Sequence, residues 1–346
     1  MIAERYLAQL LMGPPARDPV AVAERLLAVQ GQDGRGVRLA VRARTQGLTA
    51  ADFDRALTEE RTLLITWCNR GTLHLIRRED YPLLAQLTMP PVVTANARRL
   101  EQEGVTPGAA ERGVGVIERA LAEEGPLTRA QLGERIAAAG VRTEGQALLH
   151  LLVLACLRGV AIRGPMIGRQ HAYALVHDWL GPQSAPAERD RALAELARRY
   201  LRGHAPAEDR DLAKWAGLPL RDARAGLRAI AGKLHERSDG LLELASAPNQ
   251  PPEAMPPPRL LGAFDPILLG WRARDFVVGR HGPAVMIGGM FVAFALVGGR
   301  AAGLWRIERG KVSIEPFHRL AAGDRRALQA DGDDVIRYLG LDGLSR

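Results

Sequence analysis

Two glutamines one residue apart, Gln30 and Gln32, lie where an amphipathic segment meets several glycines, in the stretch AVQGQDGRG. A carboxamide neither gives up nor takes a proton at neutral pH, so this pair cannot supply a general base. It can supply two carbonyl acceptors and two NH2 donors, enough to orient a water molecule or to read the edge of a nucleic-acid base. The residue types therefore predict chemistry that depends on positioning and not on proton transfer.

The local backbone decides whether the two carboxamides can act together. If the helix that starts at Pro19 continues to Gln32, the two side chains point roughly 200° apart and cannot share a face. If the helix ends near Gln30, at the breaks that Gly31 and Gly34 introduce, the chain is extended or irregular and side chains two apart can converge. The glycines favour the second arrangement.

Hydrolysis of the N-glycosidic bond of an alkylated purine suits such a pair. The alkylated base is already cationic and leaves without protonation, and a weak nucleophile can capture the sugar cation that it creates. The carboxylate of Asp33 could stabilise that cation, as a second carboxylate does in glycoside hydrolysis. Aspartate beside glycine more commonly ends a helix or forms a turn, and the sequence leaves both roles open.

Four arginines follow the glutamines inside a window without acidic residues, from Gly34 to Ala51. Three of them recur at helical spacings of three and four residues, which predicts a basic stripe suited to phosphate contact. A solvated helix face is the alternative for any one of them, and the lack of acidic neighbours favours DNA. The four are Arg35, Arg38, Arg42 and Arg44.

The stretch TWCNRGTLHLI predicts a β-hairpin that is a second candidate for DNA contact. At its tip, Asn69 and Arg70 would present an amide and a guanidinium on a two-stranded projection, a shape that can enter the minor groove. Thr72 follows the tip and is included among the expected contacts. His74 lies just behind, and because a lone strand histidine is often a hydrogen-bonded structural residue, both roles stay open for it.

Composition indicates a globular chain of two to four modules, with 346 residues of which 47% are hydrophobic and 25% charged. The sequence has neither an apolar run of membrane-spanning length nor a basic signal-peptide lead, so we expect no membrane partner and a cytoplasmic, nucleoid-associated location. Cys68 and Cys156 lack disulfide-framework or zinc spacing, so we expect two buried thiols, no metal and no cofactor. The net charge of +8 favours a polyanionic partner.

One cycle of elements repeats three times along the chain: two or three helix-period segments, then two short strands joined by a turn. This is the order of a winged helix-turn-helix unit. We expect such units at 1–105, 106–182 and 183–246, a proline-rich linker at 247–259, and a β-rich module with a closing helix at 260–346. The predicted fold class is mainly α with β (α+β).

Several stretches resemble the AlkZ/YcaQ-like bacterial DNA glycosylases, also described as winged helix DNA-binding domain proteins. They are VQGQD, RGTLHLI, LLGAFDPILLGWRARD and GGMFVAFALVGGRAAGLWR, and the resemblance extends over essentially the whole chain. It implies tandem winged helices in a C shape with a C-terminal β-barrel, a catalytic Gln-x-Gln motif at Gln30 and Gln32, and a DNA-engaging hairpin around Asn69 to His74. Two departures concern Gly31, where a small or apolar residue such as alanine is usual, and Asn69, which replaces an apolar residue.

The resemblance also implies the activity of a monofunctional DNA glycosylase without a cofactor. Expected substrates are N-alkylated purines in double-stranded DNA, including N7-alkylguanine, N3-alkyladenine and interstrand crosslinks, in base-excision repair or in self-resistance to a DNA-alkylating natural product. A crosslinked base cannot swing into a closed pocket, so the site should be open. We expect a monomer. The alternative is a non-catalytic winged-helix transcriptional regulator, which would select a sequence and not damage.

Overall fold

The computed structural model describes residues 2–168, 170–182, 186–246 and 255–342. Contacts divide the chain into two compact units, which we describe separately. The first falls within Met1–Phe53, Leu193–Trp215 and Pro219–Arg346, and the second within Asp54–Ala192 and Ala216–Leu218. Of the expected linker at 247–259, residues 247–254 lie outside the described residues.

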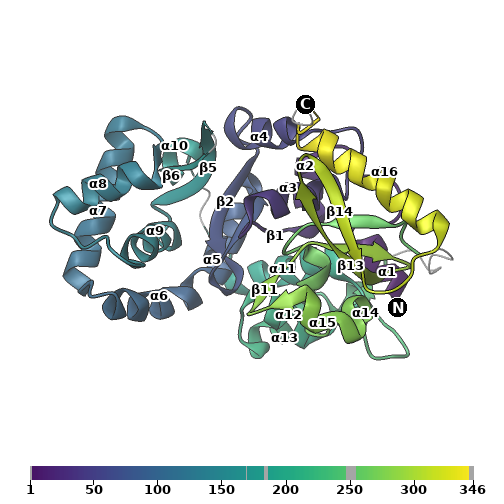
Figure 1. Ribbon diagram of the computed structural model, residues 1–346. Helices are drawn as coiled ribbons and strands as arrows, with labels where there is room; N and C mark the ends of the chain where they lie inside the picture. The colour runs from purple at the N-terminus through teal and green to yellow at the C-terminus, as the bar shows by residue number, and fades with distance from the viewer. Residues whose placement is uncertain (1, 169, 183–185, 247–254, 343–346) are drawn as a thin grey trace. The chain divides into compact units, whose positions relative to one another are not determined.

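The N-terminal part of the first unit carries the two glutamines. Its elements are α1 (Ile2–Ala8), α2 (Pro19–Leu26), β1 (Val29–Gln30) and α3 (Gly34–Arg42), labelled in Figure 1. Asp18 caps α2 by accepting a hydrogen bond from the backbone N–H of Ala21 at 2.7 Å, and Pro19 suits the first helical position. The helix ends at Leu26, well before the glutamines.

The middle of the first unit is a run of helices followed by a short hairpin. These elements are α11 (Arg189–His204), α12 (Asp209–Ala216), α13 (Leu220–Ala229), β7 (Leu234–Glu236) and β8 (Leu242–Leu244). Gly226 lets α13 cross α11 closely, because a Cβ there would lie 2.4 Å from the carbonyl oxygen of Leu193. Also on α11, the rings of Tyr200 and His204 stack with 4.7 Å between their centroids.

The C-terminal part of the first unit is an antiparallel sheet covered by a long helix. The strands β9 (Arg259–Leu261), β12 (Phe294–Val297), β13 (Arg300–Glu308) and β14 (Lys311–Pro316) pair in the order β14-β13-β12-β9. Helix α16 (Ala322–Tyr338) packs on β9 and β14, and Leu260, Trp305, Leu328 and Val335 form the shared core. Since β14 and β9 are edge strands in the described part of the chain, the expected closed barrel is not confirmed.

Shorter elements complete the C-terminal part between β9 and β12. They are η4 (Pro266–Leu268), α14 (Asp275–Val278), α15 (Gly282–Val285), β10 (Met286–Ile287) and β11 (Met290–Phe291). Among the described strands, β10 and β11 form a separate two-stranded sheet, with Ile287 opposite Met290.

The second unit is built around an antiparallel sheet with helices packed on it. Its elements are the end of α4 (Ala50–Thr58), β2 (Leu63–Cys68), η1 (Asn69–Gly71), β3 (Thr72–Arg77), α5 (Tyr81–Thr88), α6 (Pro90–Gln102), α7 (Pro107–Glu124), β4 (Leu127–Thr128), α8 (Arg129–Ala138), α9 (Ala147–Leu157), β5 (Ala161–Ile167), β6 (Gln170–Leu175) and α10 (Val176–Leu180). The strands follow the order β3-β2-β5-β6-β4. Helix α9 is apolar on nearly every side and contacts α6, α7, β2 and β5.

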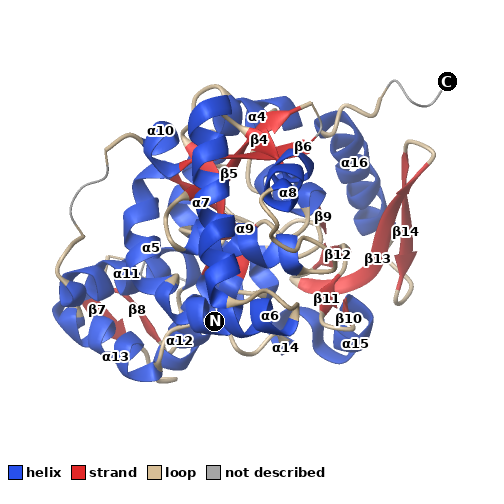
Figure 2. Cartoon of the chain, turned by 90° about the vertical axis from the view of Figure 1, so that its left-hand side faces the viewer, coloured by secondary structure: helices blue, strands red, loops and turns tan. Residues whose placement is uncertain are grey.

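The fold thus mixes helices and strands, with helix the predominant element, as Figure 2 shows. This confirms the coarser part of the predicted fold class. Both cysteines are free and buried, as the sequence predicts, and burial raises the pKa of Cys68 to about 12.

Candidate functional site

The two glutamines sit on the short connection between α2 and α3. Leu27 ends α2 with a left-handed φ of 63°, after which Val29 and Gln30 are extended. The Gln30 side chain is 7% exposed, whereas Gln32 is exposed. The chain is therefore extended at Gln30, as the favoured alternative predicts, but Leu27 makes the break and not Gly31 or Gly34. The Gln30 carboxamide lies inside the fold, and the Gln32 carboxamide lies at its surface.

Asp33 marks the start of α3. Its backbone is extended, at φ −110° and ψ 119°, and its Oδ1 accepts a hydrogen bond from the N–H of Gly36. A carboxylate at this position satisfies an unpaired N–H and complements the helix dipole. Asp33 thus takes the helix-end role that the sequence left open, which fixes the first turn of α3 directly after Gln32.

The first turns of α3 lie against the segment that follows β9. A Cβ on Gly36 would lie 2.3 Å from the carbonyl oxygen of Ala263, and a Cβ on Gly262 would lie 2.9 Å from the Cβ of Leu39. Only glycine permits such a close approach of two backbones. The C-terminal stretch LLGAFD therefore holds the helix that follows the glutamines.

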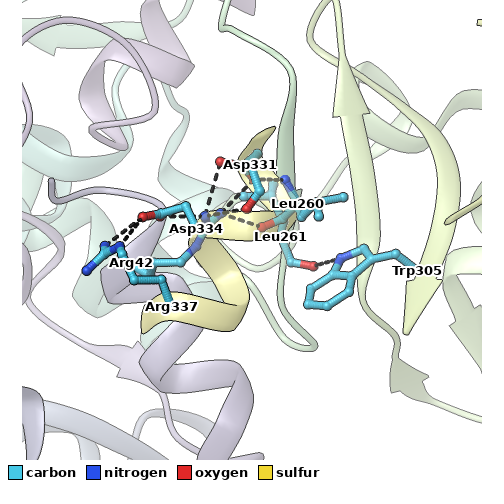
Figure 3. A network of polar contacts seen from close by, with 7 residues as sticks. All are labelled: Arg42, Leu260, Leu261, Trp305, Asp331, Asp334 and Arg337. Atoms are coloured by element: carbon cyan, nitrogen blue, oxygen red, sulfur yellow. Dashed lines mark hydrogen bonds and ion pairs between the residues drawn. The ribbon is translucent and has the colours of Figure 1, made fainter. Parts of the chain in front are cut away.

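Arg42 is buried at the end of α3 and belongs to a polar network with α16 (Figure 3). Its guanidinium bonds to Asp331 at 2.8 Å and to Asp334 at 3.0 Å, and it donates to the Leu260 carbonyl at 3.1 Å. Burial lowers the pKa of Arg42, but the two carboxylates outweigh burial and the net pKa is raised. We correct the expected DNA contact: Arg42 anchors α3, and both of its terminal guanidinium nitrogens already donate hydrogen bonds within the fold.

Arg44 follows α3 and is fully buried. Its guanidinium forms a bidentate ion pair with Asp265, with N–O distances of 2.8 and 2.9 Å, and its Nε donates to the carbonyl of Gln9 at 2.8 Å. The side chains of both partners are 0% exposed. The expected phosphate contact of Arg44 is likewise corrected, because its charge is neutralised inside the first unit.

The solvent-facing part of the basic stripe consists of Arg35 and Arg38. Arg35 is exposed, and Arg38 is half-buried with its guanidinium 4.9 Å from the ring centroid of Phe53. Arg38 also donates to the carbonyl of Gly34 at 2.7 Å. These contacts hold the Arg38 guanidinium beside the first turn of α3, the turn to which Arg35 belongs.

The tip of the hairpin formed by β2 and β3 is packed within the second unit. Asn69 is 0% exposed, and its N–H donates to the Oγ1 of Thr88 at 3.2 Å. A Cβ on Gly71 would lie 2.7 Å from the Cγ1 of Val92, and one on Gly217 would lie 2.7 Å from the nitrogen of Arg70. The tip that we expected to project is therefore packed against Thr88 and Val92 on one side and Gly217 on the other. We correct the expected DNA contact of Asn69, which is buried.

His74 is buried in β3, with Nδ1 2.9 Å from the carbonyl oxygen of Thr72. Burial lowers the pKa of His74 to about 3, and the nearby positive charge of Arg70 acts in the same direction. The imidazole is therefore neutral, and the structural role replaces the expected DNA contact. Arg70 and Thr72 are half-exposed and remain at the surface.

Within the described ranges, no group of three or more His, Cys, Asp or Glu side chains is arranged to hold a metal ion. The described helices include none with the length and apolarity needed to cross a bilayer.

Comparison with known proteins shows the family of this chain. The model of the AlkZ-like DNA glycosylases matches residues 23–338. The chain belongs to the AlkZ-like DNA glycosylase family. It is accordingly an enzyme, a DNA glycosylase of the hydrolase class.

Two individual relatives extend the comparison. This glycosylase is 26% identical to an interstrand DNA cross-link repair glycosylase of Streptomyces sahachiroi over 353 residues, which cover 96% of this chain and 92% of that one. It resembles the solved structure of Streptomyces sahachiroi DNA glycosylase AlkZ with a TM-score of 0.80 and 24% identity, over 98% of this chain and 95% of the other. The second comparison shows that the fold is shared.

A further surface feature of the glycosylase escaped the sequence analysis. Met286, Ile287 and Met290 in β10 and β11 are 42%, 57% and 55% exposed. Gly288 and Gly289 form the turn with left-handed φ values of 56° and 82°, and a Cβ on either would meet open space. The stretch MIGGMF could have indicated this exposed hairpin, because its Gly-Gly turn is flanked by apolar residues without polar ones between them. From the sequence we assign this stretch only to the β-rich module.

Proposed function

We propose that this glycosylase hydrolyses the N-glycosidic bond of N-alkylated purines in double-stranded DNA, including N7-alkylguanine and N3-alkyladenine. The observation that carries the proposal is the connection between α2 and α3, which offers two carboxamides and the aspartate that caps α3. Two carboxamides can position a water molecule but cannot act as a general base or acid. They therefore suit a reaction in which the leaving base is already cationic and needs no protonation.

In the proposed mechanism, Gln30 and Gln32 hold the attacking water. The bond between C1′ and the purine nitrogen breaks, and its electron pair neutralises the cationic base. The water oxygen bonds to the sugar cation, and its proton passes to solvent. The carboxylate of Asp33 lies next to Gln32 in the chain and adds a negative charge that favours the developing sugar cation.

We propose that the predicted DNA-contact residues that are exposed or half-exposed bind DNA. They are Arg35, Arg38, Arg70 and Thr72. Contacts with phosphates make affinity fall steeply with salt. From the family resemblance we also propose tandem winged helices, the division at 1–105, 106–182, 183–246, 247–259 and 260–346, and a C-terminal barrel. We propose a monomer that acts at the nucleoid.

The name of the Streptomyces sahachiroi relative, an interstrand DNA cross-link repair glycosylase, supports crosslinked purines as substrates here too. We include self-resistance to a DNA-alkylating natural product among the proposed roles. An exposed Gln32 agrees with an open site, which a base tethered to both strands requires.

The decisive experiment incubates the purified chain with duplex DNA that carries N7-methylguanine. We expect release of the free base and an abasic site that remains uncut until hot alkali is added. A folded protein that binds DNA and releases neither N7-methylguanine nor N3-methyladenine would overturn the proposal. Strong selection of one undamaged sequence by that inactive protein would favour the transcriptional regulator.

We also propose that the hairpin of β10 and β11 enters the minor groove, a role first expected of the hairpin tip at Asn69 and Arg70. Exposed apolar side chains on a narrow hairpin are suited to wedging between base steps in the minor groove. Its base is fixed, because Phe291 packs edge-on against Phe264 with 5.8 Å between ring centroids. The guanidinium of Arg274 lies 5.1 Å from the Phe291 ring centroid.

The double variant Ile287→Ser, Met290→Ser tests this hairpin. We expect about a tenfold or greater loss of base release from duplex DNA, because wedging supplies a few kcal/mol toward opening the base step. The matched control is Ile167→Ser, which alters a side chain of similar exposure in the second unit. Equal rates for the double variant, the control and the parent would remove the hairpin from the mechanism.

A further inference from the structure

The first unit contains a cavity of about 450 Å³ that none of the candidate catalytic or DNA-contact residues lines. It is bounded by α1, α2, the end of α11 and β8. Apolar side chains dominate its wall, among them Leu7, Leu10, Met12, Leu201 and Leu244. Its volume is in the range of cavities that hold small organic ligands.

Close packing fixes the walls of this cavity. A Cβ on Gly203 would lie 2.4 Å from the carbonyl oxygen of Arg25, so α2 and α11 cross in direct backbone contact. The Nε2 of Gln9 donates to the Gly203 carbonyl at 2.7 Å, and Arg199 donates to the Glu24 carbonyl at 3.0 Å. The cavity is therefore preformed, which lowers the cost of filling it.

Arg25 places a half-buried guanidinium in this apolar wall. Burial lowers its pKa, the neighbouring Arg202 lowers it further, and Glu24 opposes both. The Glu24 carboxylate bonds to Arg202 at 3.0 Å. No carboxylate in the described part of the chain lies within ion-pair distance of Arg25. A partly desolvated cation without an anion is costly unless a ligand supplies one.

The acidic groups of the cavity do not neutralise Arg25. Glu4 and Glu243 both bond to Arg237, at 3.0 and 3.4 Å, and neither contributes to the electrostatic surroundings of Arg25. The cavity wall thus combines apolar side chains with a guanidinium that has no ion-pair partner among the described residues and that only Glu24 partly offsets.

We propose that this cavity binds a small amphipathic monoanion, with the carboxylate of the ligand on Arg25 and its apolar body against the leucines. Arg202 also lines the cavity but is paired with Glu24, so Arg25 is the arginine that a ligand would meet. The ligand class follows from this guanidinium beside an apolar wall, because a carboxylate matches the guanidinium geometry and an alkyl or aryl body gains by leaving water. The site is independent of the glycosylase reaction proposed above.

Isothermal titration of the full-length protein with sodium decanoate, below its critical micelle concentration, tests the site. We expect saturable one-to-one binding that Arg25→Gln weakens at least tenfold and that Arg25→Lys partly restores. Decylamine, with the opposite charge, should not bind. The matched control is Arg221→Gln, which removes one cation from a side chain that is 86% exposed and should leave the affinity unchanged.

A second variant separates loss of the site from loss of the fold. Ala205→Leu adds volume to the cavity wall while keeping Arg25, and it should also weaken decanoate binding. Absence of saturable binding to the parent, or equal affinity in the parent and both variants, would overturn the proposal. Equal loss in Arg221→Gln would show attraction to net charge alone and would overturn it as well.

Discussion

Replacing Gln32 with alanine is expected to reduce single-turnover base release by about 10²- to 10³-fold, while duplex affinity changes by no more than about twofold. The magnitude is that of removing one preorganised hydrogen-bonding group from a reaction that depends on positioning. Asp33, Gly36, Arg42 and Arg44 hold α3 in place, so we expect the helix to keep its position when the exposed Gln32 is truncated.

Two comparisons make the Gln32 result specific. Gln46→Ala truncates another exposed glutamine of the first unit and should leave base release unchanged. Fluorescence anisotropy with alkylated duplex DNA measures binding, and alkali-dependent strand cleavage measures abasic sites. Full turnover by Gln32→Ala would remove the carboxamide mechanism, and a parallel loss of affinity would reassign Gln32 to binding.

The sequence supported those parts of the site that depend on local structure. The favoured end of the helix before Gln32 and one of the two roles left open for Asp33, a helix end, are both found, although Leu27 makes the break that the sequence assigned to Gly31 and Gly34. Turn residues and capping side chains act over such short ranges that one sequence is enough to predict them.

The arginines show where local reasoning stops. Helical spacing placed Arg35, Arg38 and Arg42 on one face, but Asp331 lies 289 residues from Arg42 in the chain and covers that end of the face. Likewise, Arg44 pairs with Asp265, 221 residues away. Periodicity gives the direction of a side chain along its own helix, and only tertiary packing decides whether solvent or a carboxylate meets it.

The first hairpin illustrates the same limit in a sheet. The sequence predicted a hairpin with its tip at Asn69 and Arg70, and the structure places the turn at Asn69–Gly71 between β2 and β3. Whether a hairpin tip projects or is covered depends on packing partners such as Thr88, Val92 and Gly217, which come from separate segments. The exposed apolar residues of β10 and β11 were missed for the converse reason, because apolar residues in short strands usually indicate a core.

The Asp265→Asn variant is expected to lose about 3 to 5 kcal/mol in the free energy of unfolding of the first unit. Asparagine keeps the size of the side chain but removes the charge that neutralises Arg44, and an uncompensated buried guanidinium is strongly destabilising. Asp265 also accepts a hydrogen bond from the N–H of Ile267 at 3.0 Å, so the start of η4 weakens as well. Urea unfolding followed by circular dichroism measures the change.

The two anchors of α3 provide the control for this prediction. The Asp334 side chain is 42% exposed, and Arg42 keeps its second partner Asp331 when Asp334 is replaced. The Asp334→Asn variant should therefore lose no more than about 1 kcal/mol in the free energy of unfolding. Equal losses in the two aspartate variants would contradict the argument from burial. A further variant with Arg44→Met and Asp265→Leu removes both charges and should recover part of the stability, because the cost lies in the unpaired charge and not in the missing ion pair. If Asp265→Asn lowers base release and this double variant restores it together with stability, the ion pair serves Gln30 and Gln32 only by holding α3 in place.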